Sequence, residues 1–426
     1  MNGEQMNALL LAQPGLRVVP VVPVYPLWLR GDDPAEPVTL ASTSMRMPFA
    51  VNVVDLYGTP LPGVTVRAFT NRMGRIGVTG MTDIAGMAWL SVPDTERQFE
   101  VVEVVGPPGY WPAYARSVDL QQGALTMRCA SIDFSLPGVA DHFSLRGSDA
   151  DGSGVTVGVI DSGVADHPDL TCNRAINLAR NGTVSDVSDT LGHGTHVCGI
   201  IAGRGAAGVG MRGVAPGVTL NVYKVFGAKP NETDSFALAK AIRLAVDDGC
   251  DLVNMSLGGY TDMPDVLREI QRARAMGVVC LAATGNKQRA PVTYPARYSS
   301  VLAVAASGRR HTYPAGASQE LSETMPFGVD GDDYVADFSN IGPEVGLISA
   351  GVGVVSTFRK EYAVLDGTSM ACPMATGVLA RLLGNNHGLL HAYRDQRRSD
   401  AIVKLALGSA RPLGFGPLYE GAGMLR

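Results

Sequence analysis

The chain has 426 residues, a formal net charge of −5 at pH 7, 46% hydrophobic and 18% charged residues. This length allows roughly two or three domains with buried cores, and the slightly acidic balance gives no reason to expect a nucleic-acid partner. No apolar stretch approaches the roughly 20 residues that cross a bilayer, so we expect no contact with a membrane interior.

The N-terminal 30 residues carry no cationic segment before their short leucine cluster, and four prolines then interrupt them. We therefore expect no secretory signal. The six cysteines are scattered and include no C-x-x-C pair, a pattern that favours neither a zinc site nor a disulfide framework. These features predict free thiols and a cytoplasmic location, with export by a route without a classical signal left open.

Residues 1–44 are rich in valine and proline and show little periodicity, so we expect an extended N-terminal arm. From residue 45 to residue 120, short alternating hydrophobic runs separated by turn residues predict a small all-β sandwich domain. The expected strands lie at 49–54, 64–69, 87–92 and 99–105.

Residues 121–150 are expected to form a linker. The periodicity of the hydrophobic residues then changes, and a second domain is expected from residue 151 to residue 426. The nearly all-apolar run 155–160 predicts a parallel strand covered on both faces. Helix-like and strand-like segments then alternate, which predicts an α/β fold with a parallel sheet flanked by helices. The expected helices are 193–202, 235–247 and 265–276, and the expected strands are 219–225, 251–255, 278–283 and 300–305.

Ser369 stands directly before an apolar run, 370–383, that is too long for a strand and predicts a buried helix. Pro373 is tolerated only near the start of a helix, so the helix should begin close to Ser369. Unpaired N–H groups and the positive end of the helix dipole would then stabilise negative charge beside a serine nucleophile. Taken alone, the stretch is more typical of a serine N-cap than of a nucleophile.

Asp161 ends a buried strand, His193 opens a helix, and Asn286 follows another strand. Histidine suits the task of accepting a serine proton, and a carboxylate can hold its imidazole in one tautomer. An asparagine amide could donate to the oxyanion beside the Ser369 backbone N–H. Ligands of parallel sheets bind at the carboxyl ends of strands, where Asp161 and Asn286 fall.

Five sequence blocks resemble the subtilisin family of serine peptidases, and the resemblance extends from about residue 144 to residue 426. The order in which Asp, His and Ser follow one another along the chain is the order already known for this family. The resemblance implies a serine endopeptidase with a subtilisin-like fold. The blocks are 157–163, 193–199, 254–259, 283–286 and 367–373.

The resemblance implies a role for each matching residue. Asp161 would orient the imidazole, His193 would act as general base and then general acid, Ser369 would attack the peptide carbonyl, and Asn286 would donate to the oxyanion.

The resemblance also implies a substrate-binding edge. Ser256, Leu257 and Gly258 match the family segment that pairs with an extended substrate backbone, so a protein or peptide substrate is expected. The nearby wall at 282–285 has no acidic residue, which favours an apolar residue before the cleaved bond. No cofactor is expected.

Two segments bear on metal binding. The stretch 205–213 has no carboxylate or asparagine, so we do not expect the calcium loop that many extracellular members of the family carry. An apparent insertion at 309–333 ends in an acidic cluster, Asp330, Asp332 and Asp333, which could bind calcium but is interpreted as a solvated loop.

The N-terminal region has a resemblance of its own. The pattern around Asp55, Gly63, Asp83 and Gly86 is similar to the carboxypeptidase-regulatory-like (transthyretin-like) β-sandwich family. That family is mostly accessory, which implies a regulatory or partner-binding role and no catalysis. Two alternatives therefore stay open: a latent regulatory or binding protein activated by movement of this domain, and a cytoplasmic peptide maturase.

Three further patterns have two interpretations each. His193 and His196 could be metal ligands, although no third ligand is evident. The glycines of 208–213 fit a dinucleotide fingerprint in the wrong structural context. Cys198 and Cys372 lie near the expected catalytic residues, and we interpret them as packed thiols rather than as reactive groups.

Overall fold

A computed structural model describes residues 3–13, 18–27, 38–39, 45–146, 148–205, 210–227 and 233–426. Its larger body is built on a ten-stranded sheet, most of which is parallel. In order across the sheet the strands are β11 (Arg174–Asn177), β12 (Thr219–Lys224), β10 (Thr156–Asp161), β14 (Leu252–Met255), β16 (Val279–Ala283), β17 (Val301–Arg309), β19 (Val345–Ala350), β23 (Met424–Leu425) and β22 (Ala410–Arg411), with β18 (Asp333–Val335) beside β17.

Strand β10 lies where the strand order reverses, because β12 follows it on one side and β14 on the other. All side chains of β14 and β16 are buried, as expected for parallel strands covered on both faces. The carboxyl end of β10 is therefore a topological switch point, the usual place for a binding site in an open α/β sheet.

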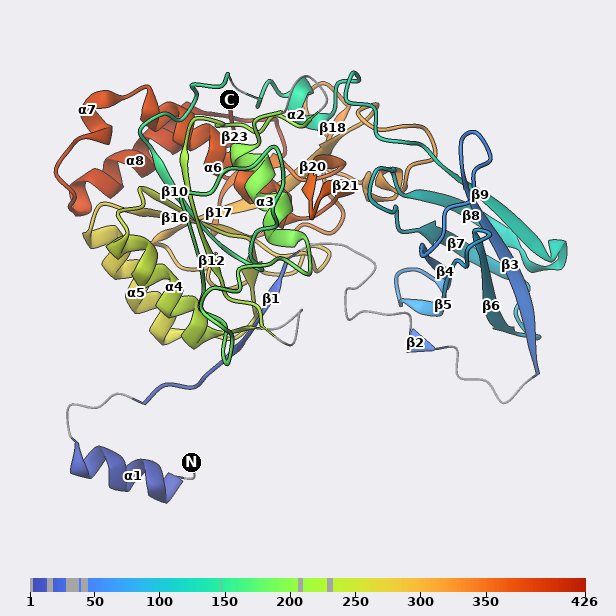
Figure 1. Cartoon of the computed structure of the whole chain (residues 1–426), viewed down its shortest axis with the longest axis horizontal. Helices are drawn as coiled ribbons and strands as arrows, with labels where there is room; N and C mark the ends of the chain where they lie inside the picture. Colours follow the sequence, from blue (N-terminus) through green and yellow to red (C-terminus); the bar gives the residue numbers. More distant parts are fainter. Residues whose placement is uncertain are drawn as a thin grey trace.

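Two helical layers cover the sheet. Helices α3 and α6 pack against each other, and α4 and α5 form a pair that Figure 1 shows on the opposite side. The predicted helices and strands of this body are confirmed, most of them within one or two residues. The helices are α2 (Val139–His142), α3 (His193–Ala202), α4 (Ser235–Asp247), α5 (Pro264–Ala275), α6 (Thr368–Gly384), α7 (His387–Leu390), α8 (Gln396–Ser409) and α9 (Pro417–Glu420).

Residues 38–39 and 46–129 contribute to two smaller sheets, which have a hydrophobic core of their own. Phe49 and Phe99 meet edge to face in this core, with ring centroids 5.8 Å apart. One sheet has the order β2 (Val38–Thr39), β5 (Ile76–Met81), β4 (Thr65–Asn71), β7 (Gln98–Val104) and β8 (Ala113–Asp119), and the other has the order β6 (Met87–Pro93), β3 (Arg46–Asp55) and β9 (Ala124–Cys129).

The small sheets contact the larger body directly. Trp111, Ala317 and Val364 form a buried cluster, and the Tyr114 hydroxyl donates a 2.6 Å hydrogen bond to Glu320. Val364 belongs to a hairpin, β20 (Val354–Phe358) and β21 (Glu361–Leu365), that leads into α6. The contact between the small sheets and the larger body thus includes the hairpin that precedes the helix carrying Ser369.

Part of the N-terminal arm departs from the expected extended chain. Residues Gly3–Ala12 form helix α1, because the run before Pro14 consists mostly of residues with good helix propensity, such as Glu4, Ala8 and Leu9. Further on, β1 (Pro23–Pro26) is extended and lies against the larger body (Figure 1). Among the described residues, no helix is long and apolar enough to span a bilayer.

Candidate active site

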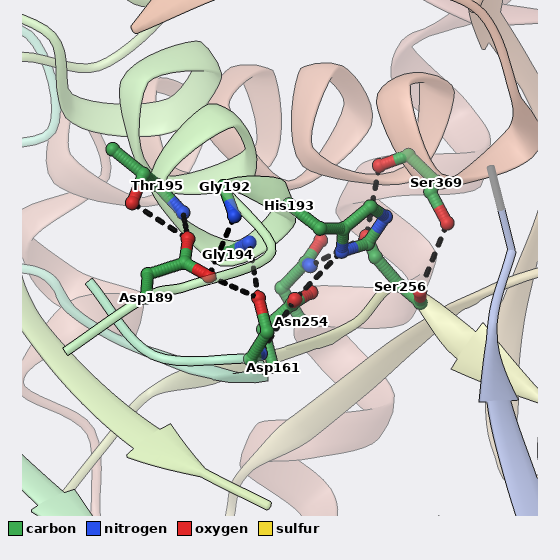
Figure 2. A network of polar contacts seen from close by, with 10 residues as sticks. Asp161, Asp189, Gly192, His193, Gly194, Thr195, Asn254, Ser256 and Ser369 are labelled. Atoms are coloured by element: carbon green, nitrogen blue, oxygen red, sulfur yellow. Dashed lines mark hydrogen bonds and ion pairs between the residues drawn. The ribbon is translucent and has the colours of Figure 1, made fainter. Parts of the chain in front are cut away.

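Asp161, His193 and Ser369 meet above the sheet although they come from three separate elements (Figure 2). Asp161 is the last residue of β10, His193 the first of α3 and Ser369 the second of α6. Nδ1 of His193 lies 2.6 Å from Oδ1 of Asp161, and both side chains are fully buried. Figure 2 shows the imidazole between the Asp161 carboxylate and the Ser369 side chain.

A carboxylate that sequence reasoning missed, Asp189, organises the start of α3. The N-cap of that helix is Gly192, which has no side chain to cap it. Asp189 accepts hydrogen bonds of 2.8 Å from the backbone N–H groups of Gly192 and Thr195, and one of 2.7 Å from the Thr195 hydroxyl. It thereby satisfies orphan donors at the positive end of the helix and fixes the backbone that carries His193.

Ser162 connects Asp189 to Asp161 and to the first turn of α3. Its hydroxyl donates to Asp189 at 2.8 Å and accepts from the Gly194 N–H at 2.8 Å, and its own N–H donates to Asp161 at 2.7 Å. Gly194 must lack a side chain, because a Cβ there would meet the carbonyl oxygen of Gly163 at 2.2 Å. The turn that follows Asp161 and the start of α3 can therefore approach closely enough for the Asp161 carboxylate to reach the His193 imidazole.

Ser369 does not cap α6. The N-cap is Gly367, so the interpretation of this serine as an N-cap is wrong. Its hydroxyl donates to the Ser256 carbonyl at 2.8 Å. Pro373 has no N–H to give to the Ser369 carbonyl four residues earlier, and the Ser256 hydroxyl takes that place at 2.9 Å. The proline thus ties the start of α6 to the segment expected to bind substrate.

Asn286 presents a buried donor at the start of α6, next to Thr368, the residue before Ser369. Its Oδ1 accepts from the Thr368 backbone N–H at 3.0 Å and from the Thr368 hydroxyl at 2.9 Å, which fixes the orientation of the amide. Its Nδ2 is buried and has no hydrogen-bond partner among the described residues. A buried amide without a partner is costly, so this donor is suited to an acceptor that arrives with a ligand.

The expected substrate edge is occupied by the chain itself. Strand β15 (Leu257–Gly258) pairs antiparallel with β1, and Tyr25 lies opposite Gly258. On its other side β1 pairs with β13 (Thr233–Asp234), so β1 is the central strand of a three-stranded sheet. The segment of Ser256, Leu257 and Gly258 therefore does bind an extended backbone in this structure.

Comparison with known proteins accounts for this geometry. Residues 152–416 match the family described as the subtilase family. The chain belongs to the subtilase family. The chain is 36% identical to a thermostable alkaline protease of Halalkalibacterium halodurans over 272 residues, which cover 63% of this chain and 67% of that protein. It is 34% identical to subtilisin DY of Bacillus licheniformis over 260 residues, which cover 60% of this chain and 85% of that protein.

A third relative is the major intracellular serine protease of Bacillus subtilis, which is 34% identical over 242 residues, covering 54% of this chain and 68% of that protein. Together the family match and these relatives show that this subtilase is a serine endopeptidase. Its substrates are accordingly proteins or peptides.

The competing metal interpretations find no support in the described part of this subtilase. Nε2 of His196 lies 3.1 Å from the carbonyl oxygens of both Val354 and Ala363, so this nitrogen already has protein partners. No group of three or more metal-ligating side chains occurs among the described residues. The stretch 205–213 and its glycine pattern include residues outside the described ranges.

The acidic loop expected to be solvated surrounds an arginine. The Arg309 guanidinium is hydrogen-bonded to Asp330, lies 2.8 Å from Asp333 and contacts Asp332 at 3.4 Å. These contacts hold the pKa of Asp330 at about 2, against the desolvation that acts in the opposite direction. The carboxylates are thus partnered by a cation that the protein supplies.

The two cysteines near the site are packed thiols. Cys198 and Cys372 are fully buried, and all six cysteines are free. Burial raises the pKa of Cys198 well above its usual range, and it raises that of Cys372 as well. A thiol that stays protonated and inaccessible is a poor nucleophile, so these groups have a packing role.

Asp366, just before the Gly367 turn, makes stability depend on pH. Its carboxylate accepts from the Gly353 N–H at 2.6 Å and from the Gln319 amide at 2.8 Å. Burial nevertheless raises its pKa from 3.8 to about 6. The folded state then binds the proton more tightly than the unfolded state, so the free energy of unfolding should fall as pH rises from about 4 to about 6, by at most about 3 kcal/mol.

Asp366→Asn should remove this dependence, because Gln319 can rotate its amide and accept from the new side chain with Oε1, which has no partner in the described part of the chain. Urea unfolding between pH 4.5 and 8 would measure it, with both forms carrying Ser369→Ala to prevent proteolysis. Equal changes of stability with pH in the two forms would contradict the prediction.

Proposed function

We propose that this subtilase cleaves peptide bonds through an acyl-enzyme on Ser369, with His193 as general base and acid and Asp161 as the group that orients it. The observation that carries the proposal is the buried 2.6 Å contact between Asp161 and His193, with the imidazole lying toward Ser369 (Figure 2). An aspartate in this position fixes the tautomer that presents Nε2 to the serine and stabilises the imidazolium that forms.

The reaction follows from these roles. The Ser369 hydroxyl transfers its proton to His193 as the oxygen attacks the peptide carbonyl, and His193 then protonates the leaving amine. Water repeats the sequence to release the acyl group. Both His193 and Asp161 are fully buried, so their interaction is little weakened by solvent.

Asn286 is the proposed side-chain donor to the oxyanion. Asn286→Ala should lower kcat by about 10²–10³ with a smaller effect on KM, because the amide would act mainly on the charge of the transition state. Steady-state kinetics on a fluorogenic peptide would measure the loss. Unchanged kcat with a raised KM would contradict the role and indicate ground-state binding instead.

Labelling with a fluorophosphonate probe tests the proposed function most directly. The probe should attach to Ser369 in the wild-type chain, and mass spectrometry of the labelled peptide would locate it. Ser369→Ala should abolish labelling, while Ser399→Ala, which alters a buried serine on α8, should not. Labelling at another serine would overturn the assignment.

We also propose that residues 45–120 are an accessory β-sandwich domain followed by a linker, 121–150, and that the peptidase domain spans 151–426. The two sheets with their own core support an accessory domain here, but β9 (Ala124–Cys129) belongs to it, so the domain extends to residue 129 and only 130–150 are left for a linker. The docking of Trp111 against Ala317 and Val364 supports a regulatory or partner-binding role near the active site. The six free cysteines support the proposal that the enzyme works in a reducing compartment such as the cytoplasm.

A second candidate function is a latent enzyme, and the occupied substrate edge favours it. A substrate cannot pair with Leu257 and Gly258 while β1 occupies the same edge. In this mechanism the N-terminal arm would keep the enzyme inactive, and activation would require removal of the arm and not a movement of the β-sandwich domain. Probe labelling of the intact chain at the rate seen after removal of the arm would exclude latency.

A further inference from the structure

We propose that Asn340 is a positioning residue for the oxyanion donor, and that it supports kcat by holding the main chain on both sides of Asn286. This inference rests on the proposed function and adds a residue to it. Asn340 is fully buried, and most of its hydrogen bonds run to the loop that carries Asn286.

Asn340 lies in the connection between β18 and β19, which runs beside the loop 284–291 that follows β16. Two backbone bonds join the connection and the loop, because the N–H groups of Gln288 and Arg289 donate to carbonyls of the connection at 3.0 and 3.2 Å. These two bonds begin two residues after Asn286. They therefore leave the peptide groups directly beside Asn286 to be held by other contacts.

The side-chain amide of Asn340 supplies contacts on either side of Asn286. Its Oδ1 accepts from the Lys287 N–H at 2.8 Å, and its Nδ2 donates to the Pro291 carbonyl at 3.0 Å and the Thr284 carbonyl at 3.2 Å. The opposite orientation of the amide would set its oxygen against two carbonyl oxygens, so this orientation is the one that satisfies the group. A single side chain thus spans the turn from which Asn286 projects.

Gly285 allows Asn340 to come this close. Its φ of +111° lies in the region that favours glycine, and a Cβ there would meet Nδ2 of Asn340 at 2.4 Å. The Gly285 carbonyl accepts from the Asn340 backbone N–H at 2.8 Å, and the Gly285 N–H donates to the Thr368 hydroxyl at 3.1 Å. The glycine therefore connects Asn340 with the residue that orients the Asn286 amide.

The support of Asn286 is thereby divided between two residues. Thr368 donates to the amide oxygen, whereas Asn340 holds the main chain that carries the amide. Without Asn340 a buried N–H and two buried carbonyls would lose a partner, and the loop would shift to find others. Oxyanion donors act through preorganisation, and a displacement of about 1 Å can cost about 10²-fold in rate. The loss should therefore fall on the transition state and not on substrate binding.

Asn340→Ala should lower kcat by about 10- to 100-fold and leave KM nearly unchanged. The loss should not exceed that of Asn286→Ala, because the residue acts through that donor. Rates are to be counted per fluorophosphonate-labelled Ser369, which excludes molecules that fail to fold. Asn177→Ala is the matched control and should keep the wild-type kcat. Asn177 is a buried asparagine on β11 whose amide also bonds to two backbone groups and packs against a glycine, Gly182.

A double-mutant cycle separates positioning from a merely structural role. In a chain that already carries Asn286→Ala, the change Asn340→Ala should lower kcat by less than about twofold further, since the donor that it positions is gone. Binding of a peptide boronic acid gives a second readout, because its tetrahedral adduct with Ser369 places an oxygen at the oxyanion position. Asn340→Ala should weaken this binding by the same factor as it lowers kcat. Losses that multiply in the double variant would overturn the inference.

Asn340→Asp covers the case in which the alanine variant does not fold. It keeps the shape and the acceptor for Lys287, but it sets a carboxylate oxygen against the carbonyls of Thr284 and Pro291. It should show the same loss of kcat and the same lack of additivity. Tyr260→Phe removes only a 3.3 Å contact of Asn340 with the tyrosine hydroxyl, and its kcat should stay within about threefold of the wild type.

The outcomes distinguish this inference from the proposed function. Wild-type kcat in both Asn340 variants, beside a loss in Asn286→Ala, would overturn the inference and leave the peptidase assignment intact. A raised KM with unchanged kcat would also overturn it and indicate a role in substrate binding. A wild-type chain that hydrolyses no peptide and takes up no probe would instead overturn the proposed function.

Discussion

Ser369→Ala should lower kcat by about 10⁶, the largest loss expected for any single substitution in this protein. Removal of the serine nucleophile from subtilisin causes a loss of this size. The physical reason here is that Ser369 carries the hydroxyl that lies beside the His193 imidazole (Figure 2). What activity remains would come from binding and oxyanion stabilisation with water as the nucleophile.

Fluorogenic peptide hydrolysis at saturating substrate would measure this loss, and circular dichroism would verify the fold. Cys372→Ala is a suitable control, because it removes a buried polar atom from the same helix without touching the proposed chemistry. A rate for Ser369→Ala close to that of the wild type would end the assignment of the nucleophile.

Asp161→Asn should lower kcat by about 10⁴ while KM changes little. The substitution is nearly isosteric and retains a hydrogen bond to His193, but the amide can favour the wrong tautomer and cannot stabilise the imidazolium. Because Asp161 and His193 are both fully buried, solvent cannot replace the lost charge.

A matched substitution at another aspartate separates this role from general destabilisation. Asp330→Asn, in the loop around Arg309, should leave the rate unchanged. An equal loss in both variants would point to general destabilisation instead.

Much of the fold and the site could be predicted because the signals are local. Buried strands such as β10 and β16 are continuous apolar runs, and helix α3 begins at the predicted His193. Asp161, His193, Ser369 and Asn286 all fall at strand or helix ends, where the sheet brings chain-distant residues together.

Other features depend on partners far away in the chain and leave no local pattern. Strand β1 has prolines at both ends, which disfavours a central strand, yet it pairs with residues more than 200 positions further on. Asp189 lies in a loop, and only the folded backbone shows that it accepts from Gly192 and Thr195. Helix Gly3–Ala12 escapes prediction because the prolines that follow it favour an extended chain over the whole arm.

Because β1 is paired with β15, it competes with every outside substrate for the same edge. A tethered segment acts as a competitor whose effective concentration is on the order of millimolar for a short flexible connection. A free peptide with similar affinity would have to reach that range before it displaced the arm. With the arm in place the enzyme should therefore not respond to dilute peptides, and removal of the arm would allow it to cleave them.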